Sequence, residues 1–231
     1  MLLSTEAVDQ LLFSEFIMSE PDFIVDTKRH LPHKQLSDSV IFLTWRLAFT
    51  LPEAIQQKLA ENRINHISAS NSLSATEKLT AKDAFAVQQF TTFDNWIDKY
   101  AGTKHYISAE PYLSIIANTI MHDERKKYDV SAYCVMPNHV HLIIKPLPKN
   151  DGVYCTILEI SEQIKSVTAH KINRVLGISG KFWQHESYDR VIRDETEYLK
   201  TVEYVINNPV KSGLVDKWEE WQGTYLCQEL R

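Results

Sequence analysis

The chain has few cysteines and no long hydrophobic run, and both shortages exclude classes of protein. Of its 231 residues only three are cysteines, and their spacing forms neither a disulfide framework nor a zinc knuckle. The longest apolar runs, such as 40–43 and 140–144, fall well short of the roughly 18 residues that a membrane-spanning helix needs. The N-terminus also lacks the basic segment followed by an apolar one that marks a signal peptide. We therefore expect reduced thiols, no membrane partner and a cytoplasmic location.

The chain also lacks a strong net charge, and the charge that it has is unevenly distributed. The net charge is −5, with 44% hydrophobic and 24% charged residues, as in an average globular protein. Residues 1–39 hold seven acidic and three basic side chains, so the other 192 residues carry only −1. Between 165 and 193, six basic residues face two acidic ones. This bias is consistent with a local basic surface, although a solvated helix face is its more common meaning.

The pattern of apolar residues predicts one α+β domain between two terminal segments. Residues 1–38 form an N-terminal extension that begins with a helical pattern at 8–16, and residues 217–231 form a C-terminal tail. The domain between them spans 39–216 and carries a helical insertion at about 64–126. We expect strands at 39–49, 128–135, 140–145 and 182–192, a polar loop at 64–80, and helices at 53–63, 81–100, 111–126, 156–176 and 195–208.

Without the insertion, the order is strand, helix, strand, strand, helix, strand, helix. This order predicts a ferredoxin-like antiparallel sheet with helices on one face.

His139 and His141 flank a single apolar residue inside the run that we interpret as the third strand. Side chains alternate along a strand, so both histidines point to one face, about 6.5 to 7 Å apart along the chain. That spacing suits two ligands of one metal ion. Two nitrogen ligands do not complete a metal shell, however, and an isolated pair is more often two hydrogen-bonded histidines on a half-exposed strand.

Tyr204 and Asn208 are four residues apart in the last expected helix and therefore share a face. Tyrosine forms covalent intermediates as a nucleophile, and an asparagine carbonyl is an acceptable ligand for Mg²⁺ or Mn²⁺. If this face turns toward the sheet, the two histidines and Asn208 make a three-ligand site beside Tyr204. The alternative is a core or capping tyrosine, which is the more common role of such a residue when no histidine pair is present.

The reaction that suits this arrangement is nicking and rejoining of a phosphodiester. The metal polarises the phosphodiester while the Tyr204 oxygen attacks phosphorus, which gives a 5′-phosphotyrosine and a free 3′-OH. Because the covalent link keeps the bond energy, another 3′-OH can reverse the step without ATP, so no nucleotide cofactor is expected.

Four blocks of this sequence, in order, resemble the IS200-like, single-tyrosine (HUH) transposases, and among them the REP-associated tyrosine transposases. The string 132–142 is similar to the family's histidine-hydrophobic-histidine motif. The other similar blocks are 163–166, 182–184 with 188–189, and 204–214, the last resembling the signature Tyr-Ile-x-x-Asn-Pro-Val-x-x-Gly-Leu. The resemblance covers most of residues 39–216, and four blocks in order make it more specific than any single block.

The resemblance implies an enzyme with His139, His141 and Asn208 as metal ligands and Tyr204 as the nucleophile. Asn208 stands where related enzymes often have glutamine. Tyr198 is the nearest rival nucleophile, but a valine follows it four residues later.

The resemblance also implies a substrate, because family members recognise imperfect hairpins in single-stranded DNA. Such binding needs positive charge along the backbone, and the candidates are Lys165, Lys171, Arg174, Arg190 and Arg193. Residues 1–38 and the segment 64–126 depart from the compact members of the family, which leaves the DNA-binding surface open.

Two other functions fit the same residues. One is a domesticated hairpin-binding protein that moves no DNA, and the other is a metal phosphodiesterase that uses water, with Tyr204 structural. The sequence also leaves open whether the chain acts as a monomer or a homodimer, and which DNA sequence it recognises.

Overall fold

The computed structural model describes residues 23–28, 32–36, 39–48, 53–70, 74–99, 107–149, 152–185 and 187–231. The chain divides into two compact units, one formed by Met1–Ala48 with Lys104–Arg231 and the other by Phe49–Thr103. The helical pattern expected at 8–16 lies outside the described residues.

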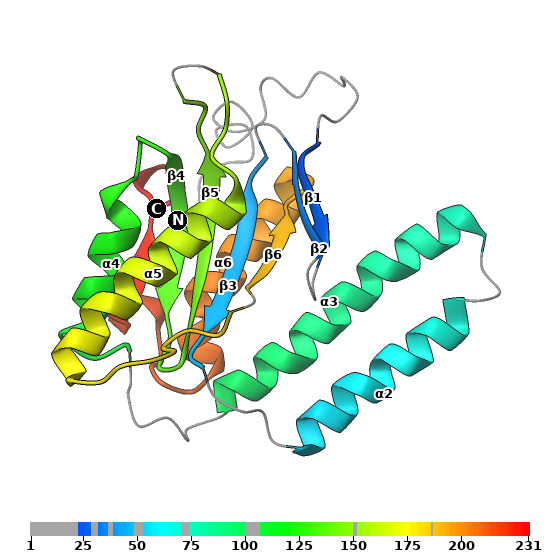
Figure 1. Ribbon diagram of the computed structural model, residues 1–231, viewed down its shortest axis with the longest axis horizontal. Helices are drawn as coiled ribbons and strands as arrows, with labels where there is room; N and C mark the ends of the chain where they lie inside the picture. Colours follow the sequence, from blue (N-terminus) through cyan, green and yellow to red (C-terminus); the bar gives the residue numbers. More distant parts are fainter. Residues whose placement is uncertain are drawn as a thin grey trace. The chain divides into compact units, whose positions relative to one another are not determined.

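A five-stranded antiparallel sheet forms the centre of the larger unit (Figure 1). Its strands lie in the order β6-β3-β5-β4-β7. Their bounds are β3 Ile41–Arg46, β4 Tyr128–Val135, β5 His139–Pro146, β6 Tyr188–Val191 and β7 Thr224–Leu226. A separate two-stranded ribbon pairs β1 (Phe23–Lys28) with β2 (Pro32–Leu36) in the expected N-terminal extension. The predicted α+β class and antiparallel sheet are confirmed.

The helices of this unit are α4 (Tyr112–His122), α5 (Ile157–Leu176) and α6 (Glu195–Lys211), followed by two short 3₁₀ turns, η1 (Trp218–Glu220) and η2 (Gln228–Leu230). The bounds of α5 agree closely with the prediction because both ends carry strong signals. Thr156 and Glu159 form a capping box at its start, and Gly177 ends it in the left-handed conformation.

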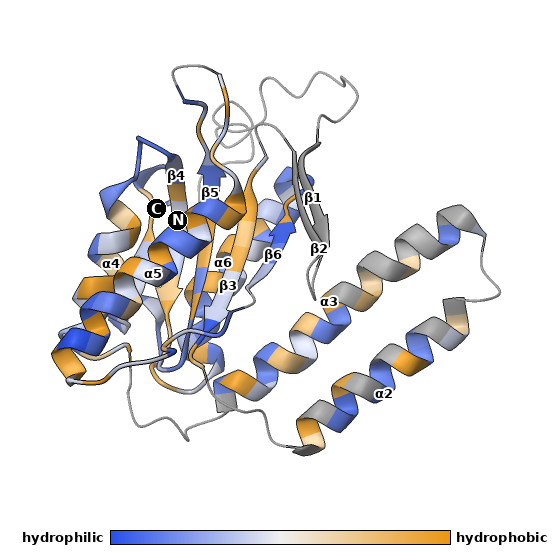
Figure 2. Ribbon diagram, viewed as in Figure 1, coloured by the Kyte–Doolittle hydropathy of each residue, from blue (hydrophilic) through white to orange (hydrophobic). Residues whose placement is uncertain are grey.

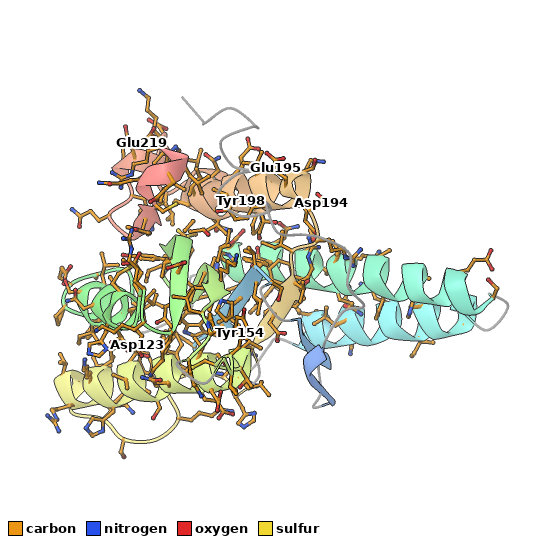
Figure 3. The ribbon with its side chains drawn as sticks, turned by 90° about the horizontal axis from the view of Figure 1, so that it is seen from above. Asp123, Tyr154, Asp194, Glu195, Tyr198 and Glu219 are labelled. Carbon is orange, nitrogen blue, oxygen red and sulfur yellow. The ribbon has the colours of Figure 1, made fainter. Side chains whose placement is uncertain are left out.

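The two faces of the sheet are covered by different helices. On one face, α4 and α5 lie together, with Gln163 of α5 bonded to Asp123 at the end of α4 and Trp183 bonded to Thr168 of α5. On the other face lies α6, so that the sheet stands between α5 and α6 (Figure 3). The expected single helical face therefore holds for α4 and α5, whereas α6 covers the face that we expected to be free of helices.

The smaller unit contains the helices α2 (Glu53–Ser70) and α3 (Ala75–Lys99). The prediction of a loop at 64–80 was wrong, because most of that segment is helical. The His66 ring stacks on Phe85 with centroids 4.1 Å apart, and this packing between the helices outweighs the polar composition. Ser74 and Glu77 bond each other's backbone amides at the start of α3, a capping-box signal that the sequence carries.

Helix α6 runs past Pro209 to Lys211, although we expected proline to stop it at Asn208. Proline lacks the N–H that would bond the carbonyl four residues earlier, so α6 continues without a hydrogen bond from residue 209 to the Val205 carbonyl. The amides of Ser212 and Leu214 bond the carbonyls of Asn208 and Pro209, which closes the last turn. The helix consequently presents about one more turn than the sequence predicted.

The C-terminal segment, which we expected to be a tail, supplies the edge strand β7 of the sheet. Its approach is close at Gly223, whose carbonyl accepts the Val135 amide at 2.9 Å. The Trp221 indole N–H also donates to the Val135 carbonyl at 3.0 Å. The tail therefore belongs to the folded core.

Gly223→Ala should destabilise the larger unit by at least about 2 kcal/mol, because an added Cβ has no room. That atom would lie 2.5 Å from the Val135 carbonyl oxygen and 2.8 Å from the Trp221 indole nitrogen. Urea unfolding of the whole chain measures the change, with the exposed neighbour variant Gln222→Ala as the control. Equal midpoints for the two variants would contradict this packing.

The hydropathy of the strands differs between the middle and the edge of the sheet. Hydrophobic residues gather in the middle of β5, whereas hydrophilic residues occupy most of β6 (Figure 2). Within the described part of the chain, no helix is both long enough and apolar enough to cross a membrane.

Candidate active site

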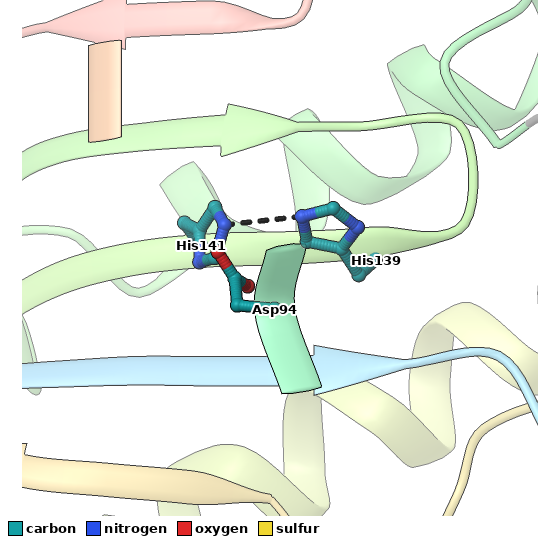
Figure 4. A group of neighbouring side chains, drawn as sticks. All are labelled: Asp94, His139 and His141. Atoms are coloured by element: carbon teal, nitrogen blue, oxygen red, sulfur yellow. Dashed lines mark hydrogen bonds between the residues drawn. The ribbon is translucent and has the colours of Figure 1, made fainter. Parts of the chain in front are cut away.

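His139 and His141 lie on β5, on the face of the sheet that α6 covers, and neither side chain is exposed to solvent. Their Nε2 atoms are 3.0 Å apart, so both imidazoles point at one position (Figure 4). The alternation of strand side chains, which predicted a shared face, is confirmed by this geometry.

The other ring nitrogen of each histidine has a polar partner. His139 Nδ1 lies 2.7 Å from the Asn138 side-chain oxygen, and His141 Nδ1 lies 2.7 Å from the Thr44 hydroxyl on β3. The amide oxygen of Asn138 can only accept, so His139 carries its proton on Nδ1 and leaves Nε2 as a lone pair. Such partners fix the tautomer and ring orientation of a histidine that binds a metal.

Both histidines are held in the neutral form. Burial lowers the pKa of His139 to about 3, with a further contribution from the positive charge of Lys211. Burial also lowers the pKa of His141 well below its usual value, helped by His139 and Lys211. Neutral imidazole is the form that binds metal ions, so the pair is ready to act as ligands at neutral pH.

The spacing of the pair fits a divalent ion. Two nitrogen ligands about 2.1 Å from one ion and at right angles to each other would lie about 3.0 Å apart. Two lone pairs at that distance repel each other unless a proton or a cation lies between them. The donor set is therefore suited to a metal ion, although a proton shared by the two rings would also satisfy it.

Asn208 and Tyr204 come to the same place from α6. The Asn208 side chain is fully buried, and its amide nitrogen lies 3.1 Å from His141 Nε2. The carbonyl and amide ends of asparagine occupy equivalent positions, so this side chain can present an oxygen to the same point. The Tyr204 ring lies edge-on to His141, with centroids 5.6 Å apart. The structure thus brings together all four residues that the sequence singled out.

The two tyrosines of α6 have different surroundings. Tyr204 is half-buried beside the histidine pair, whereas Tyr198 is 1% exposed and bonds the side chain of Ser131 on β4. Burial raises the pKa of Tyr198, which makes its phenolate harder to form. Both tyrosines belong to α6, on which Figure 3 labels Tyr198. Tyr198 therefore has the features of a core residue, whereas Tyr204 lies beside the histidine pair.

Sequence reasoning missed three neighbours of this site. Thr44 holds His141, Phe42 stacks on His141 with centroids 5.6 Å apart, and Lys211 lies over the Tyr204 ring. Thr44 and Phe42 lie on β3, far away in the sequence, and only the antiparallel register with β5 brings them here. Lys211 could have been found, because it is seven residues after Tyr204 and so falls on the same helix face.

Three of the predicted basic residues, Lys165, Lys171 and Arg174, lie on α5, across the sheet from the histidine pair. Lys165 donates to the His185 carbonyl at 2.6 Å and to the Ser187 hydroxyl at 3.0 Å, so it fastens the segment before β6. The other two are exposed on the helix. The structure does not bring these three residues to the site.

The other two basic residues lie nearer to α6. Arg190 on β6 forms an ion pair with Glu197 of α6, on the face that carries the histidines. Arg193 is exposed, and its backbone amide donates to the same carboxylate at 2.8 Å. Their roles in binding DNA stay predictions.

A family model and two curated proteins are similar to part of this chain. Residues 103–208 match the family model described as "Transposase IS200 like". A putative REP-associated tyrosine transposase of Haemophilus influenzae is 28% identical over 104 residues, which cover 42% of this chain and 58% of that protein. The REP-associated tyrosine transposase of Escherichia coli is 28% identical over 97 residues, covering 42% and 53%. The chain thus spans little more than half the length of these curated relatives.

Among solved structures, the chain is similar to one described as a REP-associated tyrosine transposase bound to a REP hairpin. The identity is 16% and the TM-score is 0.45, with 80% of this chain and 75% of that chain covered.

Proposed function

Since residues 103–208 match the IS200-like transposase family model, we propose that this chain is a metal-dependent transposase that nicks and rejoins single-stranded DNA through Tyr204. One observation carries the proposal: side chains of α6 and β5, which are distant in the sequence, lie next to each other. Tyr204 and Asn208 of α6 face the Nε2 atoms of the histidine pair on β5. A nucleophile beside a candidate metal site is what phosphodiester transfer requires.

Tyr204 is the attacking group. Its oxygen gives up its proton to solvent and forms a bond to phosphorus, the bond from phosphorus to the 3′ oxygen breaks, and that oxygen takes up a proton from solvent and leaves as a 3′-hydroxyl, so that no proton is gained or lost overall. The DNA end then remains attached as a 5′-phosphotyrosine, which a later 3′-hydroxyl attacks in the reverse sense to join strands. No net hydrolysis occurs, so the reaction needs no nucleotide cofactor.

The metal in this proposal is Mg²⁺ or Mn²⁺, held by His139, His141 and the oxygen of Asn208. A mixed set of nitrogen and oxygen ligands with open positions suits these ions. When bound, the ion would polarise the scissile phosphodiester and stabilise the charge on the departing oxygen. The protein's own part is to keep both imidazoles neutral and oriented, through Asn138 and Thr44.

The proposed substrate is a hairpin in single-stranded DNA. The curated relatives are named REP-associated, which favours REP-like hairpins for this chain. We also propose that the transposase domain extends beyond the matched segment, over the predicted 39–216 and on through strand β7, with a helical insertion between β3 and α4. Strand β3 supports this extent, because it precedes the matched segment and supplies Thr44.

The test is incubation of the whole chain with a hairpin oligonucleotide and either metal. A protein–DNA adduct that survives boiling in SDS is the expected result. Cleavage without any adduct would instead indicate a phosphodiesterase that uses water. Tight hairpin binding without cleavage in Mg²⁺ or Mn²⁺ would indicate a DNA-binding protein, and either result would overturn the proposal.

Thr44→Val should weaken Mn²⁺ binding about 10- to 100-fold, because the hydroxyl that orients His141 is lost while the side-chain shape is kept. Isothermal titration of the chain with Mn²⁺ measures the change. Thr119→Val is a matched control, since its hydroxyl donates to the Ile115 carbonyl within α4. Equal affinity of the Thr44 variant and the wild type would contradict the role of Thr44.

A further inference from the structure

Lys211 lies in the turn of α6 that follows Pro209, on the helix face that also carries Tyr204 and Asn208. Tyr204, Asn208 and Lys211 are separated by four and then three residues, so all three share one helix face. The Lys211 Nζ lies over the Tyr204 ring, 5.2 Å from its centroid. The cation is therefore beside the proposed nucleophile.

The other two residues of this helix face contact the histidine pair. The Tyr204 ring lies edge-on to His141, with centroids 5.6 Å apart, and the Asn208 amide nitrogen lies 3.1 Å from His141 Nε2. Lys211 therefore shares a helix face with two residues that contact the histidine pair.

Two ordinary roles are also open to this lysine. Cations near the last turn of a helix interact favourably with its dipole, and a cation over a tyrosine ring stabilises the packing. The contact with the ring by itself would place Lys211 on the face of Tyr204, so packing and catalysis have to be separated by experiment. A phosphodiester that Tyr204 attacks has to lie against this face of α6.

We propose that Lys211 is a further catalytic residue, whose ammonium binds a non-bridging oxygen of the scissile phosphate while Tyr204 attacks phosphorus. This inference rests on the proposed function. A phosphodiester gains negative charge as the tyrosine oxygen, deprotonated in the step, bonds to phosphorus. A lysine fixed beside that phosphate stabilises the added charge, as cationic side chains do on transferring phosphoryl groups.

The test is the rate of adduct formation in a single turnover, with the hairpin oligonucleotide at saturation and Mn²⁺ present. Lys211→Met should slow adduct formation about 100-fold, since one electrostatic donor to the transition state is lost. Lys211→Arg should recover most of the rate, because it restores the charge. Lys200→Met, an exposed lysine on the same helix, should react like the wild type.

Two further measurements separate catalysis from binding and folding. The dissociation constant for the hairpin should rise no more than about 3-fold in Lys211→Met, as expected for loss of one phosphate contact among several. The melting temperature should stay close to that of Lys200→Met.

The inference fails if Lys211→Met forms adduct at the wild-type rate, or if only its DNA affinity falls. It also fails if the Met and Arg variants are equally slow and melt early, which would make Lys211 a structural residue. Absence of adduct in the wild type itself would instead overturn the proposed function, and the inference with it.

Discussion

Tyr204→Phe should abolish the covalent adduct, with a loss of at least about 1,000-fold, because phenylalanine has no oxygen to attack phosphorus. The ring itself is kept, so its edge-on contacts with His141 and Phe42 should survive. Binding of the hairpin should therefore stay within a few-fold of the wild type. Gel analysis after boiling in SDS measures the adduct, and a filter assay measures binding.

Tyr198→Phe is the matched control on the same helix. It removes a hydroxyl that bonds Ser131 in the core and should cost about 1 kcal/mol of stability while the adduct still forms. If the Tyr204 variant forms as much adduct as the wild type, or if only the Tyr198 variant loses it, the assignment of the nucleophile is wrong.

His141→Gln should lower metal-dependent adduct formation about 1,000-fold, because a ligand worth several kcal/mol of charge stabilisation is removed. His141 is placed to be the central ligand, since its Nε2 lies 3.0 Å from His139 and 3.1 Å from the Asn208 amide. The variant should also lose the rise in melting temperature that Mn²⁺ gives the wild type. EDTA should reproduce both losses in the unaltered chain.

His170→Gln provides the control for the histidine variant. His170 is exposed on α5, where Arg174 bonds it, on the opposite side of the sheet. It should keep both the adduct and the response to Mn²⁺. A His141 variant that is still stabilised by Mn²⁺ and still forms adduct would contradict a metal site at the histidine pair.

Elements with local signals could be predicted from the sequence. The strand 128–135 and the helix that ends at Gly177 have the expected bounds, since a buried run and two helix caps determine them. Elements that depend on long-range packing could not be predicted. Strand β7 has only three residues and exists because it pairs with β4, and the helical segment at 64–70 is stabilised by packing on α3.

The residues of the candidate site also fall into two groups, those with a local signal in the sequence and those that depend on long-range packing. The histidine pair, Tyr204 and Asn208 follow from strand and helix periodicity, and the structure brings them together. Thr44 could not be predicted, because its contact with His141 depends on the register of β3 against β5. Lys211 was missed because Pro209 was expected to end the helix at Asn208, three residues before it.

The most direct test of the central claim is mass spectrometry of the proteolysed adduct formed with the hairpin oligonucleotide and Mn²⁺. The histidine pair on β5 and the residues Tyr204, Asn208 and Lys211 on α6 are proposed to form one strand-transfer site. Tyr204 should therefore carry the 5′-phosphate of the DNA. A link to Tyr198 or any other residue, or a link through a 3′-phosphate, would contradict the account.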